Sequence, residues 1–230
     1  MHCTVFLKIP LLILGATCSH IACTNPNPSP KVEESQKYNG GDWLTRFHEI
    51  VVKVIKTLAI LAAYQPSSIS KHILDILTTS GGHSATQIRF TLAFYTGILL
   101  QLFGGITRKI CYRALGQHFT FSLTVQEDHQ LVTTGPYSIV RHPAYIVAIA
   151  GSIGMLMVQL GSGSWWSECG ASETSIGRLL AVVWVASMIT IMAGAVSRVD
   201  QEDRVLRREF GIQWDTWSKN TPYRLIPGIY

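Results

Sequence analysis

Five apolar stretches, separated by polar segments, divide this chain of 230 residues. A helix that crosses a bilayer needs about 20 mainly apolar residues, and each stretch reaches or approaches that length. They cover approximately 4–23, 47–64, 87–107, 144–160 and 176–196. The second is the weakest because Lys53 and Lys56 interrupt it, whereas the fourth carries no charged residue. The pattern predicts an all-α, polytopic membrane bundle of about five transmembrane helices.

The composition agrees with a membrane protein. Charged residues make up 14% of the chain and hydrophobic residues 47%, whereas soluble domains usually carry about 25% charge. The Pro-, Asn- and Ser-rich segment 24–42 is typical of an exposed loop. The length fits one domain, 1–230, with N-terminal helices in 1–110 and a half that carries the chemistry in 111–230.

The net charge of +5 is concentrated beside the apolar stretches. This favours contact with an anionic lipid surface, and no nucleic-acid-binding motif is present, so we expect no nucleic-acid partner. The five cysteines form no CxxC pair and have no metal-ligand spacing. We therefore expect no metal site.

The distribution of Lys and Arg predicts the orientation in the membrane. The segment 108–143 holds four of these residues and the tail after Val196 holds six, whereas the loop 161–175 holds none. Short basic segments stay on the cytosolic side of a membrane, so both basic segments should be cytosolic and the loop lumenal. The two segments discussed next would then lie on the same side.

The first apolar stretch has two interpretations. Lys8 precedes a short apolar region followed by small residues, as in a cleaved signal peptide. Removing it would leave the basic segment 108–143 lumenal if the next two stretches cross the membrane, so the positive-inside pattern favours a retained helix. The argument reverses if the second stretch lies on the membrane surface.

The segment 129–145, HQLVTTGPYSIVRHPAY, places ionisable side chains at a predicted membrane boundary. Such groups are costly there unless they pair or contact a ligand. Gly135-Pro136 signals a turn, and Pro143 fits the first turn of a helix, so 129–137 should be a compact connector with His142 at the helix entrance. Free N–H groups at that entrance favour an anion such as a cofactor carboxylate. Alternatively, these side chains only anchor a helix among lipid headgroups.

The second segment, RVDQED from Arg198, follows the last apolar stretch and can fold back onto the same face. Arg198 and Glu202 are four residues apart, which places them on one side of a predicted helix. An ordinary helical ion pair, worth a few tenths of a kcal/mol, is the simpler explanation of that spacing. Trp214 and Trp217 are expected to dock the tail at the membrane interface.

Six motifs occur in a fixed order: LGQHFT from Leu115, HQLVTTGPY from His129, RHPAY from Arg141, RVDQED from Arg198, FG at Phe210 and the tail PYRLIPGIY. In this order they resemble the isoprenylcysteine carboxyl methyltransferase family over about 115–230. Three positions depart from its pattern. Val147 replaces a frequent Gly, Asp203 the second of two Glu, and Trp214 a Tyr.

The resemblance implies an enzyme that uses S-adenosylmethionine to methylate the C-terminal carboxylate of an S-prenylated cysteine. It also implies membrane-associated prenylated proteins as substrates and the endoplasmic reticulum membrane as location, with the active site facing the cytosol. No Rossmann domain is implied, and the chain lacks the G-x-G-x-x-G motif.

In the family's pattern the cofactor site is formed by the connector before the fourth helix and by the C-terminal cytosolic helix. Arg198 and Glu202 would be catalytic, with Arg198 holding the substrate carboxylate. The implied cofactor-binding residues are Gln126, His129, Gln130, Leu131, Val132, Tyr137, His142, Pro143, Ala144, Tyr145 and Glu202.

Three other functions remain open from the sequence. A related membrane enzyme could methylate phospholipid amines, but an amine acceptor would gain nothing from Arg198. A sterol-type reductase would bind NADPH instead of S-adenosylmethionine. A degenerate membrane scaffold would use the polar side chains only to anchor its helices.

Overall fold

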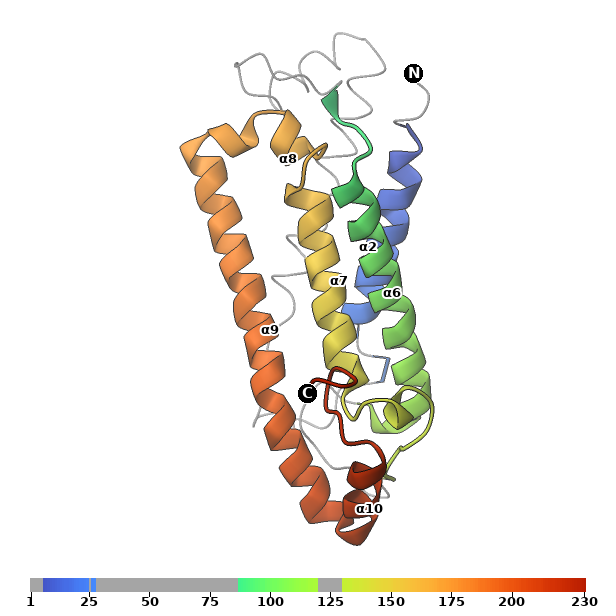
Figure 1. Cartoon of the computed structure of the whole chain (residues 1–230). Coiled ribbons are helices and arrows are strands. Elements are labelled where there is room, and N and C mark those ends of the chain that lie inside the picture. The colour runs from blue at the N-terminus through green and yellow to red at the C-terminus, as the bar shows by residue number, and fades with distance from the viewer. Residues whose placement is uncertain (1–5, 25, 28–86, 120–129) are drawn as a thin grey trace.

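The computed structural model describes residues 6–24, 26–27, 87–119 and 130–230 (Figure 1). In this part of the chain the regular structure is helical, as predicted. The long helices are α2 (Lys8–Cys23), α6 (Leu92–Leu115), α7 (Pro143–Leu160) and α9 (Ser175–Phe210). The short elements are η2 (Gly116–His118), η3 (Gly135–Ser138), α8 (Trp165–Glu168), η4 (Ala171–Glu173) and α10 (Ile212–Asn220).

Two segments of the described chain, Pro143–Glu168 and Ser175–Phe210, are long and apolar enough to cross a membrane. Helix α2 is apolar but has only 16 residues. The first, fourth and fifth apolar stretches overlap α2, α7 and α9, and the third, 87–107, overlaps α6, which begins at Leu92 and ends at Leu115. The second stretch, 47–64, lies outside the described residues, so the total of about five transmembrane helices stays a prediction.

Glycines allow α6 and α7 to pack backbone against backbone. A Cβ atom added to Gly154 would lie 2.5 Å from the carbonyl oxygen of Gly97, and one added to Gly104 would lie 2.7 Å from that of Val147. Small residues permit such close approach between membrane helices. Val147 stands where the family often has Gly, and its side chain is buried. The two helices still approach closely there, because the residue of α6 that faces the Val147 backbone is Gly104.

Helix α2 is fixed to the bundle at both ends. Near its C-terminus, the carbonyl of Ala22 accepts hydrogen bonds from Tyr112 Oη at 2.6 Å and Arg108 Nε at 3.1 Å. The buried Arg108 also donates to the carbonyl of Ala144 on α7. At the other end, Lys8 Nζ donates to the carbonyls of Arg89 and Gly163 at 2.6 and 2.7 Å. In this structure the first apolar stretch thus packs as a helix against α6.

Helix α9 continues for 36 residues through both the last apolar stretch and the RVDQED segment. At 1.5 Å per residue it is about 54 Å long, well beyond the hydrocarbon thickness of about 30 Å. The RVDQED segment therefore extends straight out of the span instead of folding back, which corrects the sequence-based expectation. The chain turns directly after α9, at Gly211, whose φ of 51° suits glycine.

Replacing Gly154 with Ala should destabilise the α6–α7 contact, because the new methyl group meets the Gly97 carbonyl. Overpacking of this kind costs about 1–3 kcal/mol. Thermal unfolding in detergent should show a lower Tm for Gly154→Ala. Gly194→Ala on α9 is the control, since nothing lies within 4 Å of its added Cβ. Equal Tm values for the two variants would contradict the close packing.

Candidate functional site

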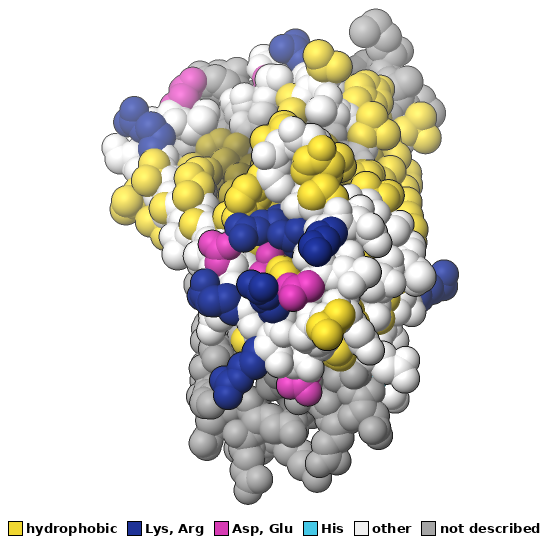
Figure 2. Space-filling model, turned by 60° about the horizontal axis from the view of Figure 1, so that its bottom comes forward, with side chains coloured by type: hydrophobic (Ala, Val, Ile, Leu, Met, Phe, Trp, Pro, Cys, Tyr) yellow, Lys and Arg dark blue, Asp and Glu magenta, His cyan; other side chains and the backbone are white. Residues whose placement is uncertain are grey.

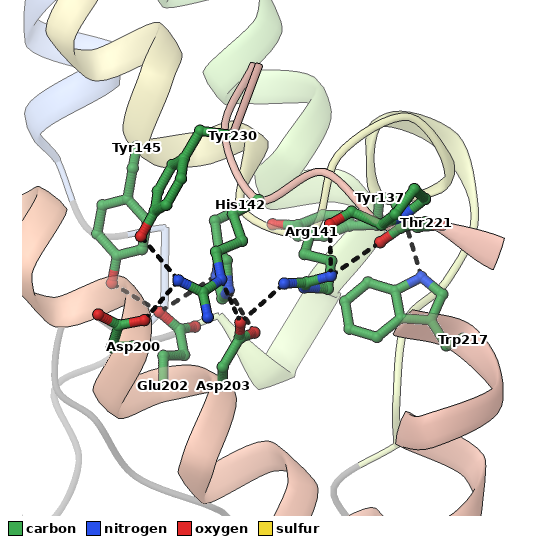
Figure 3. A network of polar contacts seen from close by, with 12 residues as sticks. Tyr137, Arg141, His142, Tyr145, Asp200, Glu202, Asp203, Trp217, Thr221 and Tyr230 are labelled. Atoms are coloured by element: carbon green, nitrogen blue, oxygen red, sulfur yellow. Dashed lines mark hydrogen bonds and ion pairs between the residues drawn. The ribbon is translucent and has the colours of Figure 1, made fainter. Parts of the chain in front are cut away.

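The candidate site lies where the start of α7 meets the C-terminal part of α9 (Figure 3). Helix α7 begins at Pro143, as predicted, because proline suits the first helical position and His142 provides a non-helical N-cap with φ −126° and ψ 60°. The turn expected at Gly135-Pro136 is the 3-10 helix η3, entered with φ 63° at Gly135. This compact connector places Arg141 and His142 at the end of the bundle, directly before α7.

Asp203 is the centre of the polar network. One carboxylate oxygen lies 2.8 Å from His142 Nε2, and the other lies 3.1 Å from Arg141 Nη2 and 3.3 Å from Arg224 Nε. Burial alone would raise the pKa of Asp203, but the hydrogen bonds and charges of His142 and Arg141 lower it overall. Asp203 is therefore a buried carboxylate held in its ionised form.

Glu202, the neighbouring acid, is in a more open position. Its Oε2 accepts a 2.7 Å hydrogen bond from Tyr145 Oη and lies 3.7 Å from His142 Nδ1. The Glu202 side chain remains 30% exposed, compared with 7% for Asp203. The two acids thus contact opposite nitrogens of one imidazole, and only Glu202 keeps access to a ligand.

The C-terminal tail completes the network. The backbone N–H groups of Arg141 and His142 donate to the carbonyls of Tyr223 and Arg224 at 2.9 and 2.8 Å. The Arg224 guanidinium then reaches Asp200 Oδ1 at 2.6 Å and Tyr230 Oη at 2.8 Å. In the space-filling view of this end of the molecule, Lys and Arg side chains surround Asp and Glu side chains (Figure 2). The site is thus held by three segments: the α7 start, α9 and the tail.

The two tail tryptophans contact protein. Trp217 is buried, packs against Cys111 and Tyr137, and donates its indole N–H to the Tyr137 carbonyl at 3.1 Å. The centre of the Trp214 ring lies 5.7 Å from the guanidinium carbon of Arg141 and 5.8 Å from that of Arg207. The tail is therefore docked on the protein itself, and the expectation of a membrane-interface role for Trp217 was wrong.

The structure brings His142, Tyr145 and Glu202 into direct contact. Other expected site residues lie nearby in different surroundings: Leu131, Val132 and Ala144 pack against the cluster of Cys111, Tyr137 and Trp217. Gln130 is exposed, whereas Gln126 and His129 lie outside the described residues. Burial and the neighbouring Cys111 and Glu202 raise the pKa of Tyr137, so its phenol stays neutral. The binding roles of all these residues remain predictions.

Arg198 lies one helical turn before Glu202 on α9 and is half-buried, within electrostatic range of Tyr145. Sequence reasoning gave no role to Asp203 or Arg224, although both are central to the network. The signal for Asp203 was its position directly after Glu202, whereas Arg224 had no comparable signal. Among the described residues, no three His, Cys, Asp or Glu side chains are grouped to hold a metal ion.

A helical bundle with two membrane-length helices and a charged network at one end is typical of a membrane protein. Residues 97–165 match the model of the isoprenylcysteine carboxyl methyltransferase (ICMT) family. The resemblance predicted from the motifs is therefore confirmed, and this stretch carries the family's sequence pattern.

Relatives of several kinds match part of this chain. Protein-S-isoprenylcysteine O-methyltransferase B of Arabidopsis thaliana is 24% identical over 128 residues, which cover 55% of each chain. The nickel-cobalt-cadmium resistance protein NccN of Alcaligenes xylosoxydans xylosoxydans is 36% identical over 42% of this chain and 36% of its own. The Delta(14)-sterol reductase TM7SF2 of Mus musculus is 29% identical over 44% of this chain and 20% of its own. The match thus spans about half the length of the methyltransferase relative.

Neutralising Asp203 with the isosteric Asp203→Asn should destabilise the protein strongly, because it leaves the cations around that position without their buried partner. Breaking a buried ion pair typically costs about 3–5 kcal/mol. Chemical unfolding in detergent would measure the change. Asp215→Asn removes a solvent-exposed pair with Arg207 and should cost less than about 1 kcal/mol. Similar losses for both variants would contradict the central position of Asp203.

The lowered pKa of Asp203 also predicts a pH dependence. A carboxyl whose folded pKa lies below its ordinary value of 3.8 stabilises the fold fully above that pH. Its contribution is lost as the pH falls from 3.8 toward the lowered folded value. Tm measured between pH 6 and pH 3 should therefore converge for wild type and Asp203→Asn at the acidic end. Parallel curves throughout would show that Asp203 titrates normally.

Proposed function

We propose that this protein transfers a methyl group from S-adenosylmethionine to the C-terminal carboxylate of an S-prenylated cysteine. One observation carries the proposal: Tyr145 of the RHPAY motif donates to Glu202 of the RVDQED motif, although 57 residues separate them. Two motifs associated with this chemistry thus form one contact at the end of the bundle. The match to the ICMT family and to a methyltransferase of that type supports the same activity.

The residues present are chemically suited to the methyl donor. When bound, S-adenosylmethionine supplies an electrophilic methyl group on a sulfonium cation. Glu202 is partly exposed, so its carboxylate can accept hydrogen bonds from ribose hydroxyls or an ammonium group. The half-buried ring of Tyr145 offers an aromatic face to a cation. Glu202 and Asp203 already flank the α7 start. A cofactor carboxylate bound there would therefore lie beside two other carboxylates.

Arg198 is our candidate for holding the acceptor. A C-terminal carboxyl has a pKa of about 3.5, so it is ionised at neutral pH and needs no general base. A guanidinium can hold both oxygens of such a group and direct one of them at the methyl carbon. Because Arg198 and Glu202 are one turn apart on α9, acceptor and donor would be aligned by the same rigid helix. Rate enhancement would then come mainly from alignment and the exclusion of water.

The membrane setting fits a substrate that carries a prenyl chain. The apolar lengths of α7 and α9 end beside the polar network, so a prenyl chain could enter laterally between helices while its carboxylate stays at the boundary. The basic residues at this end support a cytosol-facing site under the positive-inside rule. We propose the endoplasmic reticulum membrane as its location.

A second candidate is a sterol-type reductase, favoured by the match to the mouse Delta(14)-sterol reductase. Such an enzyme would bind NADPH, whereas the proposed methyltransferase would bind S-adenosylmethionine. Isothermal titration of the full chain in detergent with each cofactor separates these activities. Binding of NADPH alone would replace our proposal with the reductase, and binding of neither would favour the scaffold.

Glu202→Gln should lower kcat/KM on a farnesyl-cysteine analogue by about 100-fold, equivalent to about 2.7 kcal/mol, because the neutral amide weakens donor binding and the Tyr145 contact. Methyl transfer by purified protein from labelled S-adenosylmethionine measures this. Glu209→Gln changes an exposed acid two turns further along the same helix and should retain activity. Arg198→Ala should mainly raise KM for the acceptor. Equal turnover in wild type, Glu202→Gln and Arg198→Ala would remove the proposed site.

A further inference from the structure

A separate cavity of about 390 Å³ opens beside the ends of α2 and α6. The ends of α2 and α6 that line it lie at the same end of the bundle as the start of α7 (Figure 1). Among the described residues, its lining combines apolar and aromatic side chains with basic ones and includes no acidic residue. The lining residues are His20, Ile21, Thr24, Pro26, Asn27, Lys109, Tyr112, Arg113 and Gly116.

Two cations lie at this cavity, and the described part of the chain places no counter-charge beside them. Lys109 and Arg113 are exposed, and their spacing of four places them on one side of α6. Neither has a carboxylate partner among the described residues. His20 approaches from α2, across the cavity. Unpaired cations on the same side of a helix favour an anionic ligand.

The walls of the cavity are fixed by hydrogen bonds. Tyr112 is buried and donates to the Ala22 carbonyl at 2.6 Å, which joins α6 to α2 behind the cavity. Asn27 Nδ2 donates to the carbonyls of Gly116 and Phe119, each at 2.8 Å, and closes the end. Arg108 binds the same Ala22 carbonyl and also the Ala144 carbonyl, so it lies between this cavity and the α7 start.

We propose that this cavity binds the phosphate headgroup of an anionic phospholipid. Lys109 and Arg113 would contact the phosphodiester oxygens, and the apolar wall formed by Ile21 and Pro26 would take the glycerol end of the acyl chains. Basic pockets between helices at the membrane surface bind lipids in this way. The position fits, because the basic segment 108–143 begins in the last two turns of α6, beside the end of α2. The proposal does not depend on methyl transfer.

The test uses the full chain in detergent and native mass spectrometry with phosphatidylglycerol and phosphatidylcholine of identical acyl chains. We expect one retained phosphatidylglycerol, bound about tenfold or more tightly than phosphatidylcholine. Lys109→Gln/Arg113→Gln should abolish that preference. Thr24→Phe, which fills the cavity without changing the charge, should also reduce binding.

The matched control is Arg208→Gln/Lys219→Gln, which removes two exposed positive charges outside the cavity lining. It should bind phosphatidylglycerol like wild type, and the Tm of each variant confirms that it is folded. Equal loss in this control would overturn the proposal in favour of diffuse surface attraction. Unchanged binding by Thr24→Phe would place the lipid elsewhere. Displacement of the lipid by millimolar inorganic phosphate would identify a free-phosphate site instead.

Discussion

A single buried carboxylate, that of Asp203, determines how the polar end of this bundle is assembled. An ionised acid in a buried position costs several kcal/mol unless cations and hydrogen bonds surround it. Here the partners come from two other segments: His142 and Arg141 before α7, and Arg224 in the tail. The need to compensate one charge therefore holds α9, α7 and the C-terminus together.

The same network separates a structural acid from an accessible one. Asp203 and Glu202 are adjacent on a helix, so their side chains point in directions about 100° apart. Asp203 is enclosed by its cations, whereas Glu202 contacts Tyr145 and one edge of His142 within the described part of the chain. Rigid positioning of His142 by Asp203 leaves Glu202 in a fixed and partly open place, which is what a ligand-binding carboxylate requires.

Sequence patterns predicted the elements better than the contacts between them. The lengths of the apolar stretches indicated α2, α6, α7 and α9, and Pro143 marked a helix start. The straight continuation of α9 was missed because its hydropathy falls at Arg198 while its helical hydrogen bonding does not. Arg224 and the burial of Trp217 depend on how the tail returns to the bundle, and no local periodicity encodes that path.

The central claim is that the α7 start and α9 form one binding site for the methyl donor. An experimental structure of the full chain with S-adenosylhomocysteine, the product of that donor, tests it most directly. We expect the ligand within hydrogen-bond distance of the Glu202 carboxylate and beside His142. A ligand bound elsewhere, with Glu202 still occupied only by Tyr145, would contradict it.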